Sequence, residues 1–240
     1  MALSPSLDPA NVARYRKKDP RADTVQPDPE LDSLAAALGA AQTAAAEIDT
    51  LAATVAADRS KPPAENAIRL RAAATSIGQR GVARLDLALA RTQGELDRLT
   101  TGTWAPPAPK TAIEEARASE LRTVLRSLAP KDRTTAIGER LAAGDDVFLA
   151  AILAGIDPLM TGMTTTEIDA VRHRWRQQKF PTELDRIDRL AKAAAAARRA
   201  GLAFVAHVEA HANSQPARLA EIAAKAAADA VAIAAAGNRA

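Results

Sequence analysis

Apolar residues recur at alternating steps of three and four along the chain after residue 30. This heptad spacing is typical of helices that pack side by side. Just before it, Asp28, Pro29 and Glu30 supply an N-cap, a proline suited to a first turn and an acidic side chain near the helix N-terminus. The pattern predicts a long helix that begins at about Leu31.

A proline-containing break at residues 59–63 separates this helix from a second one with the same spacing. Two seams joined by a short turn predict an antiparallel hairpin over residues 31–103. Because alanine-rich seams bury little area, we expect this hairpin to need a partner or a second copy of the chain. The candidate self-association seam consists of Leu31, Leu34, Leu38, Ile48, Val55, Val82, Leu85, Leu89, Leu96 and Leu99. Gly78, Gly81 and Gly94 lie within the second helix and indicate close contact with another helix.

Bulky apolar residues concentrate in residues 111–180. There Thr111 with Glu114, and Thr164 with Glu167, have the spacing of helix capping boxes. Short capped helices with large apolar side chains predict one small compact helical domain in this segment.

The remaining segments predict less compact structure. Residues 1–30 contain five prolines and few large apolar side chains, so we expect an extended arm, either a tether to a neighbour or a disordered terminus. Residues 104–110, with three prolines, predict a linker. Residues 181–240 predict a second alanine-rich helical hairpin. One face of its last helix carries Leu219, Ile222, Ala226 and Ile233.

The composition favours an all-α fold, with elongated coiled-coil-like hairpins flanking the compact domain. The 240 residues include 61 alanines, and only 2% are aromatic, which favours helices and leaves little bulk for large sandwiches or barrels. The absence of cysteine excludes a disulfide framework, a thiolate zinc site and a cysteine nucleophile. The net charge of +3 indicates no particular partner.

We expect neither a signal peptide nor a transmembrane span. The first ten residues lack a basic leader followed by an apolar run. The longest apolar run, residues 147–156, is shorter than the roughly 18 residues that a membrane-spanning helix needs. It predicts a buried core helix instead.

Two histidines, His207 and His211, have the i, i+4 spacing of a metal clamp on one helix face. A zinc-protease motif would place glutamate directly after the first histidine, whereas Glu209 points to the opposite face, and no third ligand has matching spacing. We therefore expect solvent-exposed histidines and no metal site.

Residues 172–180 combine four cations with two aromatic residues on one expected helix. Such a composition can bind phosphates and stack on bases. The candidate nucleic-acid contacts are Arg172, Arg174, Arg176 and Lys179. The alternative is that Trp175 and Phe180 pack inward while the cations stay solvated or pair with neighbouring acids.

The pair Asp145 and Asp146 could take part in acid–base or metal chemistry, but its place after Gly144 favours helix capping. The sequence contains no Gly-rich phosphate loop, no nucleophile elbow and no dinucleotide fingerprint. We therefore expect a protein that is not an enzyme and binds no cofactor. An enzyme with a buried helical site is the remaining alternative.

One segment resembles a known class of proteins. It has a helix ending at Leu128, a helix starting at Pro130, the two aspartates after Gly144 and a capping box before a basic helix. In this order of features, residues 121–190 resemble small all-helical proteins encoded in the structural modules of tailed phages and prophages. The resemblance implies no catalytic or binding residue that can be transferred to this chain.

The resemblance implies a structural or assembly protein of a phage-like particle, located in the virion or the host cytoplasm. Its expected partners are itself, as a homo-oligomer, and other virion or assembly proteins, with weak nucleic-acid contact as a further possibility. The alternative function is a nucleic-acid-binding or regulatory helical module that uses the basic helix around residues 172–180.

Overall fold

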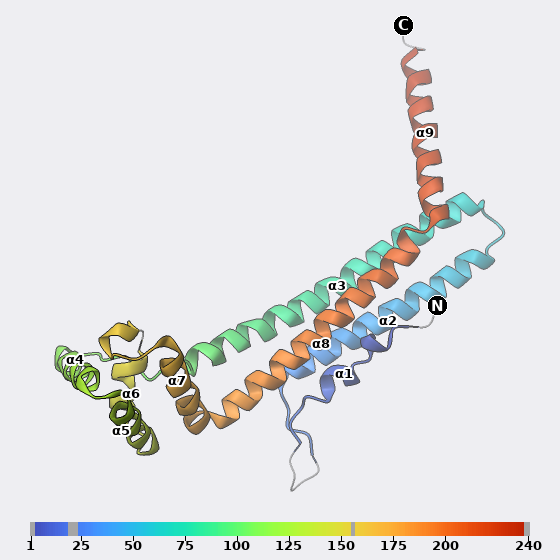
Figure 1. Ribbon diagram of the computed structural model, residues 1–240. Coiled ribbons are helices and arrows are strands. Elements are labelled where there is room, and N and C mark those ends of the chain that lie inside the picture. Colours follow the sequence, from blue (N-terminus) through green and yellow to red (C-terminus); the bar gives the residue numbers. More distant parts are fainter. Residues whose placement is uncertain (1–2, 19–23, 155–156, 238–240) are drawn as a thin grey trace. The chain divides into compact units, whose positions relative to one another are not determined.

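The computed structural model describes residues 3–18, 24–154 and 157–237 (Figure 1). Its regular elements are helices, and an isolated bridge joins Lys18 to Val25. The all-α fold class is therefore confirmed for the described residues. The α-helices are α1 (Ala10–Ala13), α2 (Pro29–Ala57), α3 (Pro63–Gly102), α4 (Ala112–Ser127), α5 (Pro130–Ala142), α6 (Asp146–Leu153), α7 (Thr165–Lys179), α8 (Pro181–Ala212) and α9 (Gln215–Gly237). Two 3-10 turns, η1 (Pro5–Leu7) and η2 (Pro158–Met160), accompany them.

The chain divides into two compact units. Unit 1 contains residues 1–95 and 189–240, and unit 2 contains residues 96–188. Unit 1 is therefore discontinuous in sequence, and unit 2 is the stretch of chain between its two parts. The sequence analysis instead predicted domains that follow one another along the chain, because heptad spacing does not identify which helices pair.

The helix starts follow from their capping residues. The Asp28 carboxylate accepts a hydrogen bond from the Leu31 amide, and Pro29 is the first residue of α2. The capping boxes predicted for α4 and α7 are both present, because the threonine and glutamate side chains bond reciprocally to backbone amides. Local sequence therefore determines where these helices begin.

Three long helices, α2, α3 and α8, form the core of unit 1 (Figure 1). The small cluster of Ile48, Ala74, Ile77 and Ala212 contains residues from all three. The expected separate hairpin of residues 181–240 is therefore wrong, because α8 packs against α2 and α3. Its alanines permit this close packing. Ala193, Ala194, Ala196, Ala197 and Ala200 are all buried.

Two glycines of α3 allow α8 to approach closely. A Cβ atom at Gly78 would lie 2.6 Å from a methyl carbon of Val208, and one at Gly81 would lie 2.6 Å from the ring of Phe204. The predicted close helix contact is confirmed at these two positions. It is wrong at Gly94, where an added Cβ would meet nothing within 4 Å.

The seam residues are largely covered within the chain. Most of them are buried, namely Leu31, Leu34, Leu38, Ile48, Leu85, Leu96 and Leu99, and the others, Val55, Val82 and Leu89, are partly buried. The expectation that this seam joins copies of the chain assumed a two-helix hairpin. With α8 as a third helix, most of the seam in unit 1 is already covered.

The N-terminal segment is folded onto unit 1. Leu7 and Val12 are fully buried, and η1 and α1 both contact α2. Arg189 of α8 donates a hydrogen bond to the carbonyl of Tyr15 at 3.2 Å and lies 3.8 Å from the Asp28 carboxylate. The prediction of an extended arm over residues 1–30 is therefore wrong for the described residues, since two buried apolar side chains suffice to attach it. Residues 1–2 and 19–23 lie outside the described residues.

Unit 2 has its own hydrophobic core, whose residues lie within the segment 111–180 where the sequence analysis expected a compact domain. The core consists of Leu125, Ile137, Leu141, Phe148, Leu149, Ile152, Leu153, Met163, Ile168 and Trp175. The apolar run predicted to form a core helix contributes α6, in which residues 148–153 are buried. Residues 155–156, at the end of that run, lie outside the described residues.

Among the described residues, no helix combines the length and the apolar character needed to cross a membrane. This agrees with the expectation for the apolar run of residues 147–156, most of whose described residues lie in α6, a helix of eight residues.

Candidate functional site

The two histidines of α8 lie against α2. His207 is buried, with 8% of its surface exposed, and His211 is partly buried. Nε2 of His211 lies 2.9 Å from Oδ1 of Asp49, and Nε2 of His207 lies 3.4 Å from the same oxygen. The expectation of solvent-exposed histidines is therefore wrong for His207, because the contact between α8 and α2 covers this helix face.

Trp175 of the basic helix α7 and Phe180, which caps the C-terminus of α7, face the core of unit 2. Trp175 is buried, and its ring meets that of Phe180 edge to face, with 5.3 Å between centroids. The indole Nε1 donates a hydrogen bond to Oδ1 of Asp146 at 3.1 Å. These two rings therefore belong to the packing of unit 2, as in the alternative interpretation of residues 172–180.

Three of the four candidate nucleic-acid contacts interact within unit 2. Arg172 pairs with Asp169, and its guanidinium lies 4.5 Å from the centre of the Trp104 ring. Arg176 donates a hydrogen bond to the hydroxyl of Thr103 at 3.1 Å and lies 5.8 Å from the same ring. Lys179 is bonded to Asp146, and Arg174 is exposed.

These contacts weaken the electrostatic case for phosphate binding, because two cations are already paired with carboxylates. Burial, followed by the charge of Arg172, lowers the pKa of the Arg176 guanidinium. Nucleic-acid contact at Arg172, Arg174, Arg176 and Lys179 stays a prediction. A salt-dependent affinity for DNA that is lost on charge reversal would test it.

The two adjacent aspartates have different roles. Asp145 accepts a hydrogen bond from the amide of Phe148 at 3.0 Å and so caps α6, as predicted. The Asp146 carboxylate lies 2.7 Å from Nζ of Lys179. This hydrogen bond is the main cause of a lowered pKa of Asp146, to which the bond from Trp175 adds while burial opposes it. Asp146 therefore fastens α7 to the start of α6.

The last helix exposes the row of apolar residues that the sequence indicated. Ala217 and Ala220 are buried, and Arg71 of α3 pairs with Glu221. From residue 221 to residue 230, every residue is exposed. Leu219, Ile222 and Ile233 have exposed fractions of 60%, 66% and 73%.

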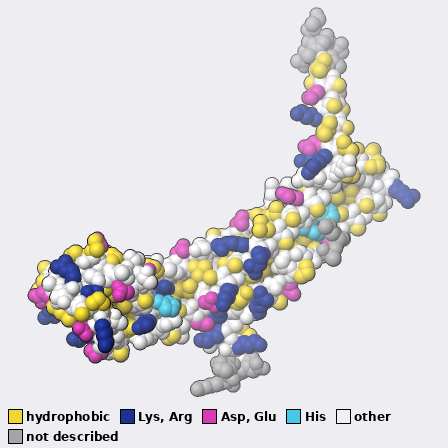
Figure 2. Space-filling view, in the orientation of Figure 1, with side chains coloured by type: hydrophobic (Ala, Val, Ile, Leu, Met, Phe, Trp, Pro, Cys, Tyr) yellow, Lys and Arg dark blue, Asp and Glu magenta, His cyan; other side chains and the backbone are white. Residues whose placement is uncertain are grey.

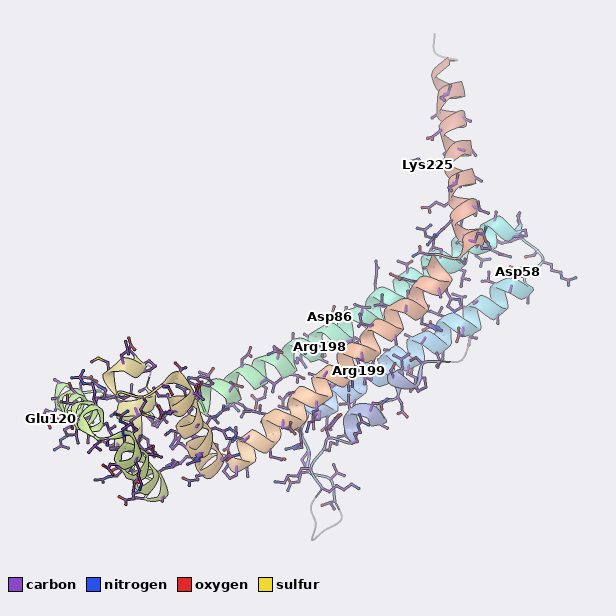
Figure 3. All side chains as sticks on the ribbon, in the orientation of Figure 1. Asp58, Asp86, Glu120, Arg198, Arg199 and Lys225 are labelled. Carbon is purple, nitrogen blue, oxygen red and sulfur yellow. The ribbon has the colours of Figure 1, made fainter. Side chains whose placement is uncertain are left out.

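The exposed apolar row follows α9 as it leaves the packed helices of unit 1 (Figure 2). Lys225, labelled in Figure 3, projects from the same helix. This region of α9 forms an exposed surface that combines apolar and charged side chains.

Comparison of the chain with models of protein families, with curated proteins and with solved structures finds no match. The function therefore has to be argued from the residues and their geometry.

Sequence reasoning missed Asp49. It lies on α2, 162 positions before His211, and no spacing rule connects residues so far apart. The available signal was that Asp49 directly follows the seam residue Ile48, at a heptad position that flanks a helix–helix seam. Only the packing of α8 on α2 shows that Asp49 meets the histidines.

Proposed function

We propose that this chain is a non-enzymatic structural or assembly protein of a phage-like particle, acting through helix-mediated self-association and partner binding. The observation that carries the proposal is the exposed apolar row of Leu219, Ile222 and Ile233 on α9. The resemblance of residues 121–190 to proteins of phage structural modules supplies the expected setting.

An amphipathic helix owes most of its stability to burial of its apolar side. Among the side chains of α9 that the structure describes, that burial reaches only Ala217 and Ala220, at its beginning. The large apolar side chains further along would be stabilised by a second helix packed against them. Exposed apolar side chains aligned on one helix are typical of association surfaces.

The spacing of the apolar residues on α9 fits a helix–helix seam. Steps of three, four and seven residues lead from Leu219 through Ile222 and Ala226 to Ile233. Two exposed charges of opposite sign, Lys225 and Asp229, lie four residues apart on α9, whereas Glu221 pairs with Arg71. In an antiparallel pair of α9 helices, Lys225 of each copy can lie opposite Asp229 of the other. The preferred occupant is therefore α9 of a second copy of the chain.

Sedimentation equilibrium over a wide range of protein concentrations tests this proposal. We expect wild-type protein to associate and a triple variant, Leu219→Ser, Ile222→Ser and Ile233→Ser, to remain monomeric. The matched control is Leu87→Ser with Leu202→Ser, because these side chains are also exposed but lie on α3 and α8. A wild-type protein that stays monomeric throughout, or equal association of the two variants, would contradict the role of α9.

The particle setting requires a separate measurement. Quantitative mass spectrometry of purified particles would give the copies of this chain per major capsid protein, in precursor and in mature particles. A fixed ratio in mature particles would indicate a built-in component, and presence only in precursors would indicate a scaffold. Absence from both would exclude a virion role and make nucleic-acid binding the leading alternative.

A further inference from the structure

Asp49, His207 and His211 bring three metal-ligating side chains together on two helices. Each residue offers one ligand atom, and these atoms all lie within 4.8 Å of one another. We propose that this cluster is a binding site for a divalent transition-metal ion of the zinc type. Imidazole nitrogen and carboxylate oxygen are ligands that zinc uses in proteins.

Two of the three ligand–ligand distances suit coordination of one ion. Ligand atoms at zinc–ligand distances of 2.0–2.2 Å in a tetrahedral site lie roughly 3.3 Å apart. Oδ1 of Asp49 lies 3.4 Å from Nε2 of His207 and 2.9 Å from Nε2 of His211. The two imidazole ligand atoms lie within 4.8 Å of each other, so the rings would have to turn toward each other for all three atoms to surround an ion. With three protein ligands, the fourth position stays open to water.

The histidine rings are also placed as a clamp. They are one helical turn apart on α8, and their centroids are 5.0 Å apart. Both rings present Nε2 to the same carboxylate oxygen, which lies on α2. Two neutral imidazoles can therefore direct their Nε2 lone pairs at the same point when the proton of each ring is on Nδ1.

The Nε2 atom of His207 lies between two oxygens. It is 3.3 Å from the carbonyl oxygen of Ala45, with which it shares a hydrogen bond, and 3.4 Å from Oδ1 of Asp49. Both distances exceed the 2.9–3.0 Å that is usual for N–H···O bonds.

The core residues next to Asp49, His207 and His211 hold these three ligands in defined positions. Ile48, beside Asp49, and Ala212, beside His211, belong to the same small core cluster, and Val208, beside His207, packs against it. The ligands are therefore carried by backbone that the core holds in place. The side chains of His211 and Asp49 are 17% and 23% exposed, which gives an ion access to the site.

An ion at this site would cross-link α2 and α8, two helices that the chain joins only through unit 2. An ion that binds only the folded state stabilises that state, by an amount that rises with the logarithm of the free ion concentration above the Kd. The site therefore adds to the proposed function a metal-dependent stabilisation of the folded unit 1. It does not depend on association through α9, because none of its ligands lies on that helix.

Isothermal titration of zinc chloride into tag-free, chelator-treated full-length protein tests the site. We expect one zinc ion per chain and a melting temperature that rises with zinc and falls again with EDTA. Asp49→Asn and His207→Gln should each weaken binding by at least the roughly 10–100-fold that loss of an outer-sphere partner costs. Cobalt binding, read from its visible absorption, should be lost in the same variants.

Asp49→Asn is the decisive variant, because the amide oxygen can still accept hydrogen bonds from both imidazoles but is a poor metal ligand. His173→Ala is the matched control, since His173 is the third histidine of the chain and lies exposed on α7. Circular dichroism before titration establishes that each variant is folded. The proposal is overturned if wild-type protein shows no saturable binding, if Asp49→Asn binds zinc as wild type does, or if binding is lost with His173.

Discussion

At the scale of single residues, Gly81 determines how closely α3 and α8 pack. An added Cβ would lie 2.6 Å from two ring carbons of the fully buried Phe204. We expect Gly81→Ala to destabilise unit 1 by about 1–3 kcal/mol, because overpacking outweighs the better helix propensity of alanine. Gly94→Ala is the control, and it should stabilise the same helix by about 0.5–1 kcal/mol, since its Cβ meets nothing within 4 Å. Urea unfolding followed by circular dichroism measures both, and equal effects would refute the close contact.

Asp146 gives unit 2 a pH dependence whose sign follows from its lowered pKa, caused first by Lys179 and then by Trp175. A carboxyl whose pKa is lower in the folded state stabilises that state above its unfolded pKa. This contribution is lost as the pH falls through the folded value. The Asp146 side chain is 38% exposed, so solvent screening keeps the pair within the about 0–1 kcal/mol of surface ion pairs.

We therefore expect Asp146→Asn to destabilise unit 2 at neutral pH and the difference from wild type to shrink below about pH 4. Asparagine retains an oxygen for the Trp175 indole, so the variant removes mainly the charge. Lys179→Met should reproduce most of the effect. Thermal unfolding monitored by tryptophan fluorescence between pH 7 and pH 2.5 measures it. A constant difference across this range would show that the pair with Lys179 is not responsible.

At the scale of helices, neighbouring residues determine where a helix starts, whereas the fold of the whole unit determines which helices pack together. The starts of α2, α4, α6 and α7 could be predicted, because a cap and the amides that it bonds lie within four residues. The partner of α8 could not, because its alanine stripe fits any closely packed neighbour. Whether α8 folds back on α9 or joins α2 and α3 depends on the shape of the whole bundle.

The same distinction applies to the candidate metal site. The helical spacing of His207 and His211 was visible in the sequence, and it places both rings on one face. Asp49, the third ligand, could not be identified without knowing that α2 covers that face. Asp49 follows a heptad position of a helix far away in sequence, so the site could be predicted only as an incomplete pair. In the basic segment of α7, by contrast, the sequence suggested a nucleic-acid contact, whereas the structure shows most of these side chains in packing contacts and ion pairs within unit 2.

At the scale of the whole molecule, unit 1 is assembled from the two ends of the chain, with unit 2 as the stretch between them. Each unit has a hydrophobic core of its own. Phe204 is fully buried in unit 1, and Leu153 belongs to the core of unit 2. A domain with a separate core can unfold locally without loss of the rest. α3 and α8 cross the boundary between the units, so their continuity is the route by which one unit could affect the other.

Hydrogen–deuterium exchange of two cavity variants measures how far the cores are independent. Leu153→Ala should cost about 2–5 kcal/mol and speed exchange in α4 to α7, while α2 keeps the protection of wild type. Phe204→Ala should cost about 3–5 kcal/mol and speed exchange in α2 and α8, while α6 stays protected. Both substitutions leave an apolar cavity, so a difference between the two variants reflects which unit contains the cavity and not the kind of substitution. If either variant speeds exchange equally in both units, the continuous helices α3 and α8 make the chain a single cooperative structure, and stabilisation of unit 1 by zinc would then protect unit 2 as well.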